Sequence, residues 1–166
     1  ENMGDGTLKK YEITDQQYGQ SYPREAVFAD FNLDGRIDVL VVGHGYDMSD
    51  NTEKGFEDRH LLYLSNNNGG YTDSSNLLDD ESGTTRSGAI TQGFTHSVAA
   101  DDINGDNYPD IYIGNAGGSD TKLYINKQGK SFETKALPPE IFSLFGDNSN
   151  TYLTVLFVDY DNDNIK

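Results

Sequence analysis

The stretch Asp30-Phe31-Asn32-Leu33-Asp34-Gly35-Arg36-Ile37-Asp38 decides how this chain folds. Side chains with oxygen atoms stand at its first, third, fifth and ninth positions, and a glycine stands at its sixth. Calcium takes about six to eight oxygen ligands, and alternate side chains of a tight turn can converge on one ion. Arg36, at the seventh position, would add only its backbone carbonyl oxygen. The spacing therefore predicts a loop that binds a divalent cation.

The same spacing returns twice further along the chain. Asp102–Asp110 repeats it in full, and a third copy begins at Asp159. The sixth position holds Asn107 in the second copy and Asn164 in the third, and Asn adopts the left-handed backbone more readily than most residues other than glycine. Such recurrence predicts an internal repeat, with each copy of the loop belonging to one structural unit.

An EF-hand does not fit these loops. An EF-hand loop ends in a Glu at its twelfth position and lies between two helices. Here the twelfth position is Val41 in the first copy and Ile113 in the second. The flanking residues are short runs rich in β-branched side chains, which favour strands. The loops are therefore predicted to be tips of β-hairpins, with Asp38 and Asp110 as their closing carboxylates.

Composition agrees with a turn-rich all-β chain. The 166 residues are 34% hydrophobic and include 18 glycines, 11 tyrosines and 8 phenylalanines. Cysteine is absent, so no disulfide stabilises the fold. No apolar run approaches the ~18 residues of a membrane-spanning helix. No signal peptide is visible, and a start at Glu1 is compatible with a chain that is processed or a fragment of a longer one.

The net charge of −16 argues against nucleic acid and anionic membranes as partners, because both attract basic surfaces. Most of the acidic residues are expected to form a solvated surface. The acids clustered in the loops repel one another unless a cation neutralises them, which again favours bound calcium.

A second feature recurs in phase with the loops. Tyr63–Tyr71 and Tyr124–Phe132 each have an apolar strand end, a turn rich in Gly, Asn or other polar residues, and an aromatic residue that opens the next strand. Residues 2–8 fit the same template. Each unit is therefore predicted to have four strands. The expected strands are 26–29, 37–42, 60–65 and 71–73 in the first unit, 97–100, 111–114, 122–126 and 131–135 in the second, and 152–158 in a third.

These two motifs together resemble the FG-GAP/VCBS repeat, which is found in integrin α-subunit heads and in many secreted bacterial proteins. The resemblance implies a β-propeller of four-stranded antiparallel blades, with the rest of the ring supplied by the same longer chain or by other subunits. It implies two to three calcium ions and an extracellular or cell-surface location. Along the chain it implies the end of one blade at 1–21, full blades at 22–78 and 79–140, and the start of another at 141–166.

Carried over by position, the family's calcium ligands fall on side chains in all three loops. They are Asp30, Asn32, Asp34 and Asp38, then Asp102, Asn104, Asp106 and Asp110, then Asp159, Asp161 and Asp163, with backbone carbonyls from Arg36, Tyr108 and Ile165.

Antiparallel strands would put the metal loops at one end of the blades and the long connections at the other. The connection 43–59 has Tyr46, Asp47, Asp50 and Phe56, which are candidate contacts for a sugar or a basic protein. The preferred interpretation of this segment by itself is a solvated insertion. The favoured function is protein or glycan binding.

Two other functions stay open. One is a structural role, in which repeats assemble into a fibre or a surface layer. The other is a secreted enzyme that acts on polysaccharides, with His44 and His60 as an acid/base or metal pair. No nucleophile motif or phosphate loop supports the enzyme, so no catalytic residue is assigned. His96 is expected to have a structural role.

Overall fold

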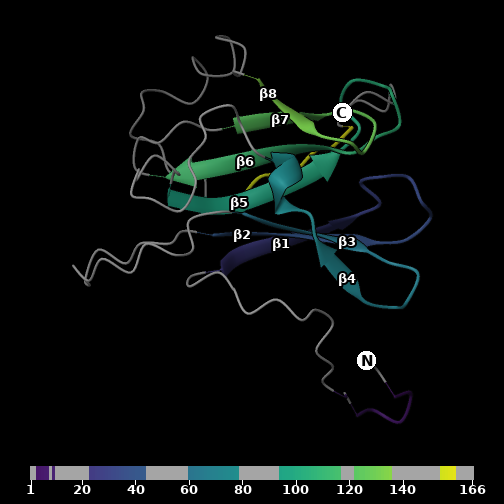
Figure 1. The fold of residues 1–166 in the computed structure, drawn as a ribbon. Coiled ribbons are helices and arrows are strands. Elements are labelled where there is room, and N and C mark those ends of the chain that lie inside the picture. The colour runs from purple at the N-terminus through teal and green to yellow at the C-terminus, as the bar shows by residue number, and fades with distance from the viewer. Residues whose placement is uncertain are drawn as a thin grey trace, which may run out of the picture.

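The computed structural model describes residues 3–7, 9, 23–43, 60–78, 94–116, 122–135 and 154–159. Within these residues the chain forms two four-stranded antiparallel sheets and one short 3-10 helix (Figure 1). Blade A, the first sheet, contains β1 (Pro23–Ala29), β2 (Asp38–Gly43), β3 (Leu61–Ser65) and β4 (Tyr71–Asp73), followed by the helix η1 (Ser75–Leu78). Blade B contains β5 (Phe94–Asp101), β6 (Asp110–Ala116), β7 (Lys122–Asn126) and β8 (Phe132–Lys135). The predicted all-β fold with blade-like sheets is confirmed.

The strands of each sheet lie in chain order, so successive connections alternate between its two ends. Ala29 pairs with Asp38 across the first connection of blade A, and Ser65 pairs with Tyr71 across the third. The first loop (residues 30–38) and the turn 66–70 therefore lie at the same end of blade A. In blade B, the second loop (residues 102–110) and the turn 127–131 have the same relationship.

The side chains of blade A alternate as a sheet with one buried face requires. In β1, Val27 is half-buried while Phe28 is exposed, and in β2 Leu40 and Val42 have no exposed surface. The buried face is apolar because it meets the second sheet rather than water. The alternation is one of burial, since residues 39–42 of β2 are all apolar, and packing against the second sheet decides which face of the strand is buried.

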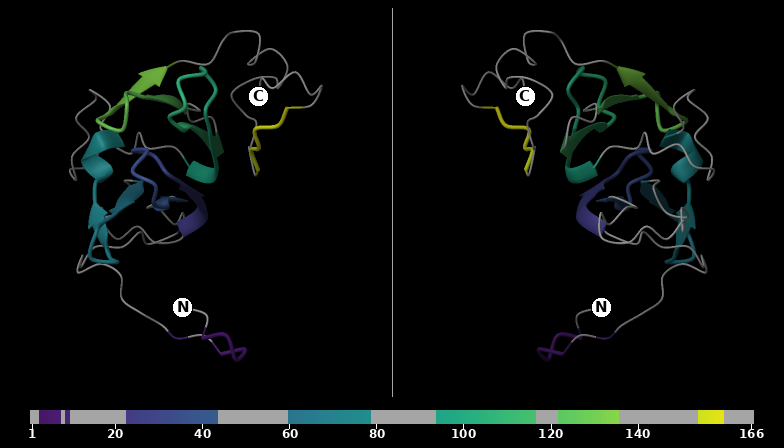
Figure 2. Two further views of the ribbon diagram at one scale, coloured as in Figure 1. Left: turned by 90° about the vertical axis from the view of Figure 1, so that its right-hand side faces the viewer. Right: turned by 90° about the vertical axis from the view of Figure 1, so that its left-hand side faces the viewer.

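The core of the molecule lies between the two blades, which stand side by side (Figure 2). One continuous apolar cluster draws residues from both sheets. Its buried members are Phe31, Leu40, Val42, Leu62, Leu78, Val98, Ile111, Ile113, Tyr124 and Phe132. Each blade thus provides the other with its buried face, and the interface between the repeats is the hydrophobic core.

A register irregularity occurs at the same repeat position in both blades. It falls between Pro23 and Glu25 in β1 and between Thr95 and Ser97 in β5. An extra residue in a strand re-aims neighbouring side chains. In blade A the carboxylate of Glu25 accepts a hydrogen bond from the backbone N–H of Val98 in blade B at 2.8 Å. The irregularity in β1 thus lies next to a polar contact that fixes the blades against each other.

The turn between the third and fourth strands of each blade (66–70 and 127–131), called the outer turn below, is closed by an equivalent backbone hydrogen bond. The N–H of Asn66 donates to the carbonyl of Gly70 at 2.9 Å, and the N–H of Lys127 donates to the carbonyl of Ser131 at 2.8 Å. Residues 3–7 lie apart from the two sheets (Figure 2) and make the same contact, from Met3 to Thr7 at 3.1 Å.

The strands differ from the sequence expectation mainly at their ends. Both first strands begin earlier than expected, at Pro23 and Phe94, and β6 extends to Ala116. The strand expected at 152–158 is wrong for the residues that are described, because 154–159 are not in a strand. A strand needs a hydrogen-bonded neighbour, and no strand pairing is found for these residues; the segment does meet blade B through the rings of Phe157 and Tyr112, whose centres are 6.3 Å apart.

No helix in the described part of the chain is long and apolar enough to cross a membrane.

Candidate metal loops

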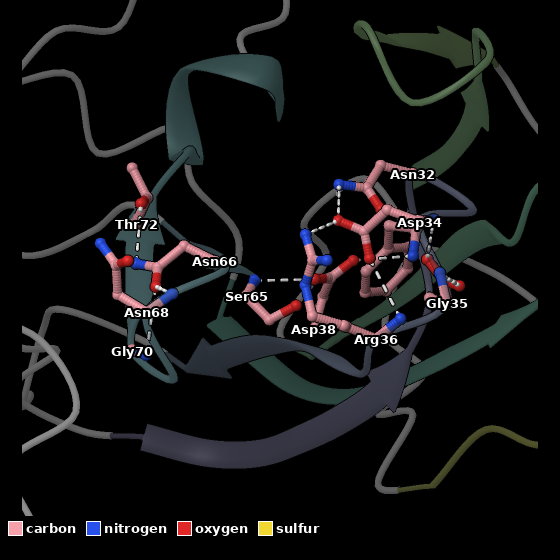
Figure 3. A network of polar contacts seen from close by, with 12 residues as sticks. Asn32, Asp34, Gly35, Arg36, Asp38, Ser65, Asn66, Asn68, Gly70 and Thr72 are labelled. Atoms are coloured by element: carbon pink, nitrogen blue, oxygen red, sulfur yellow. Dashed lines mark hydrogen bonds and ion pairs between the residues drawn. The ribbon is translucent and has the colours of Figure 1, made fainter.

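The first loop is folded by hydrogen bonds from its own backbone to its acidic side chains (Figure 3). Asp30 accepts from the N–H of Asp34 at 3.0 Å and from the N–H of Gly35 at 2.7 Å. Asn32 accepts from the same Asp34 N–H at 3.1 Å, and Asp34 accepts from the N–H of Arg36 at 3.0 Å. Alternate side chains therefore turn toward the inside of one tight bend.

The second loop repeats this pattern with different residues. Asp102 accepts from the N–H groups of Gly105 at 2.8 Å, Asp106 at 3.1 Å and Asn107 at 2.7 Å. Asn104 accepts from Asp106 at 2.9 Å, just as Asn32 accepts from Asp34. Lost hydration raises the pKa of Asp102, but the hydrogen bonds from Asn107, Gly105 and Asp106 outweigh it, so this pKa lies below its ordinary value.

Both loops need a left-handed backbone at two positions. The sixth position has φ of 85° at Gly35 and 73° at Asn107, which confirms the expectation for Asn107. The fourth position, where no such turn was predicted, has φ of 56° at Leu33 and 82° at Gly105. Leucine seldom adopts this conformation. The sequence signal that could have revealed it is the glycine at the same place in the second loop.

Asp38, at the ninth position, ties the first loop to a distant strand. It has no exposed surface, and its two oxygens accept from the N–H of Phe31 at 2.9 Å and the N–H of Ser65 at 2.8 Å. Asp110 is equally buried and does the same with Ile103 at 3.2 Å and with Asn126 at 2.8 Å. Each closing carboxylate thus joins its loop to the end of the third strand of its blade, a role that spacing alone did not reveal.

Burial raises the pKa of Asp38 above its ordinary value; the N–H groups that it binds oppose this, and the charge of Asp34 adds to it. The pKa of Asp110 is raised in the same way, first by burial and further by Asp106 and Asp102. The acids of each loop are therefore close enough to repel one another, and a cation would relieve that repulsion.

The loop residues match calcium in the kind of donor that they offer. Carboxylate and amide oxygens are the ligands that calcium takes, and a carboxylate that accepts one N–H on each oxygen keeps lone pairs for a metal. The geometry is less complete. Across the described residues, no group of three or more His, Asp or Glu side chains is gathered closely enough to hold an ion. The side-chain oxygens of the loops are of the kind that calcium binds, but in this structure they accept hydrogen bonds from backbone N–H groups.

Several predicted residues lie outside the described part of the chain. Of the third loop only Asp159 is described, while Asp161, Asp163 and Ile165 are not. The candidate ligand contacts Tyr46, Asp47, Asp50 and Phe56 also fall outside it.

Of the proposed histidine pair, only His60 is described. It is buried directly before β3, and His44 falls outside the described residues. His96 lies inside β5, at the register irregularity.

Comparison with known protein families gives a match for one part of this chain. Residues 102–166 match the sequence model of the FG-GAP-like repeat, which includes the second loop and β6–β8. No curated protein and no solved structure gives a significant match. The first loop lies outside the matched range, but its hydrogen bonds follow those of the second loop.

Proposed function

Because residues 102–166 carry an FG-GAP-like repeat, we propose that the chain is part of an extracellular β-propeller that calcium stabilises and that binds a protein or a glycan. The observation that carries the proposal is the repetition of one loop architecture, with the same donors and the same buried closing carboxylate, in two successive blades.

Calcium would be held by the side-chain oxygens of the two full loops and by the backbone carbonyls of Arg36 and Tyr108. The bound ion would neutralise the carboxylates that repel one another in each loop. Because the unfolded chain does not hold these oxygens together, binding stabilises the folded state. Isothermal titration with calcium tests this, with magnesium as the control ion. We expect two to three ions per chain, and no heat of binding would contradict the calcium part of the proposal.

The outer face of blade A supports a ring that contains further blades. The residues Val39, Val41 and Tyr63 stand at the register positions that Ile111, Ile113 and Tyr124 occupy in blade B. In blade B these three residues are buried in the core between the blades. On the same face of blade A, Phe28 is 64% exposed, and Ile37, directly before β2, is 55% exposed. This face therefore suits a further repeat packed against it.

The ligand would be bound at the end of the blades opposite the metal loops. Antiparallel order brings the connections after β2 and β6 to that end, and loops on a rigid scaffold commonly carry binding residues. A glycan array and a screen of extracellular proteins would identify the ligand. We expect Tyr46→Ala and Phe56→Ala to weaken binding while calcium titration is unchanged. Equal binding by both variants would contradict a site in this connection.

A structural assembly is the second candidate, because the exposed apolar face of blade A could also receive another copy of the protein. Sedimentation in calcium over a range of concentrations distinguishes the two. A compact monomer at all concentrations opposes assembly, whereas growth into larger species that Phe28→Ser suppresses supports it.

A further inference from the structure

Asn126, at the end of β7, joins the two blades through its side chain. It is 1% exposed, and its Nδ2 donates to the carbonyl of Phe31 at 2.8 Å and to the carbonyl of Pro109 at 3.0 Å. Its Oδ1 accepts from the N–H of Gly129 at 2.7 Å. One buried amide therefore connects the first loop of blade A, the second loop of blade B and the β7–β8 turn.

Both backbone polar groups of Phe31 are consequently fixed. Its N–H donates to Asp38 within blade A at 2.9 Å, and its carbonyl accepts from Asn126 of blade B. Its ring packs edge-on against the ring of Phe132, with the ring centres 6.1 Å apart. The start of the first loop is thus held from inside its own blade and from the next one.

Gly129 brings the turn into backbone contact with the same loop. A Cβ atom placed on Gly129 would lie 2.7 Å from the Cα of Asn32 and 2.9 Å from its Cβ. Gly129 also has φ of 71°, which side chains disfavour. Only glycine lets the turn lie this close to the loop.

Blade A does not have these features at its own outer turn. Ser65 takes the register position of Asn126, because Ser65 pairs with Tyr71 as Asn126 pairs with Phe132. Gly69 has φ of 78°, but among the described residues a Cβ there would meet no atom within 4 Å. Within the described part of the chain, the contact occurs at the junction between blades A and B.

We propose that residues 126–129 are a latch through which blade B holds the first loop of blade A in its folded shape. Asn126 supplies the hydrogen bond to Phe31, and Gly129 permits the close approach to Asn32. Order in the first loop then depends on the outer turn of the next repeat, and a ligand that orders either part also orders the other. The latch does not require a metal, so it stands apart from the proposed calcium function.

Amide hydrogen exchange of the full protein, measured by NMR in the presence of a chelator, tests this proposal. The variants are Asn126→Ser, which installs the side chain that blade A has, and Gly129→Ala, which obstructs the approach to Asn32. Gly69→Ala is the matched control, because it imposes the same left-handed cost without a contact to any described residue. We expect the amides of Phe31, Asp34 and Gly35 to exchange about tenfold faster in both variants, and as in the parent protein in the control.

The amides of β6 and β7 report whether blade B stays folded. Faster exchange in the first loop with unchanged exchange in these strands supports the latch. Unchanged exchange in the loop overturns it, as does an equal effect of Gly69→Ala. If one of the two variants also speeds exchange in β6 and β7, the proposal is judged on the other variant alone. If both do, the turn supports the whole blade rather than the loop, and the proposal fails.

Discussion

The carboxylate of Asp38 accepts a hydrogen bond from the backbone N–H of Ser65, although the two residues are 27 positions apart. Through it, the loop between β1 and β2 is attached to the end of β3. Asp110 and Asn126 repeat the contact 16 positions apart in blade B. The ninth residue of each loop is therefore part of the framework of its blade, whether or not it also binds a metal.

We predict that Asp38→Ala destabilises the protein strongly even without calcium. The substitution leaves the N–H groups of Phe31 and Ser65 without their acceptor, and each buried unsatisfied group costs about 1–3 kcal/mol. The free energy of unfolding should fall by roughly 3 kcal/mol in urea titrations with chelator. Asp34→Ala, at a more exposed site, is the control and should change it by less than about 1 kcal/mol. Equal effects would show that Asp38 has no framework role.

Calcium should stabilise the protein through the exposed acids of the loops. At 100 times its dissociation constant, calcium adds about 2.7 kcal/mol per site. Asp34→Ala and Asp106→Ala should each remove most of one such increment, as measured by melting with calcium and with chelator. Asp5→Ala removes an exposed acid outside both loops and should leave the increment unchanged. A melting curve that calcium does not shift in the parent protein contradicts the prediction.

The left-handed residue at the fourth loop position predicts opposite effects in the two loops. Leu33 is exposed, and its left-handed backbone conformation is unfavourable for leucine but less so for Asn. Leu33→Asn should therefore stabilise the fold by up to about 1 kcal/mol. Gly105→Ala introduces that cost and should destabilise by about 1 kcal/mol. Chemical denaturation measures both changes, and the same sign for the two would refute the assignment.

The pKa of Glu133 predicts one pH dependence outside the metal loops. Hydrogen bonds from Lys127 and Lys135 lower this pKa to about 2. A lowered pKa in the folded state means stabilisation that is complete above the ordinary value of 4.5 and is lost as the pH falls toward about 2. Carboxyl NMR titration should show the low value, and Lys127→Met or Lys135→Met should each raise it. A titration near the ordinary value in the parent protein would remove the basis of this prediction.

The loops, the blades and the outer turns follow from local patterns in the sequence. The Asp30–Asp38 spacing predicts the bend because the hydrogen bonds within the loop join residues at most seven positions apart. The short run of β-branched residues after the first loop likewise predicts β2, in which Leu40 and Val42 face the core.

The contacts between blades could not be predicted in this way. The bond from Asn126 to Phe31 spans 95 positions, and only the packing of one sheet on the other brings them together. The strand expected at 152–158 is wrong for its described residues for the same reason, because an apolar run and its place in the repeat say nothing about which strand it pairs with.

The junction between the blades predicts a measurable coupling between Phe31 and Phe132. Both rings are buried and meet edge-on, a geometry worth about 0.5–1.5 kcal/mol beyond the area that they bury. Phe31→Leu and Phe132→Leu should each destabilise, and the double variant should lose less than the sum by about that amount. A matched cycle of Phe31→Leu with Tyr112→Leu should be additive, because Tyr112 alternates along β6 with the core residues Ile111 and Ile113 and its ring packs against that of Phe157. If the first cycle is additive as well, the rings do not couple the repeats, and the polar contacts of Asn126 and Glu25 must hold the junction.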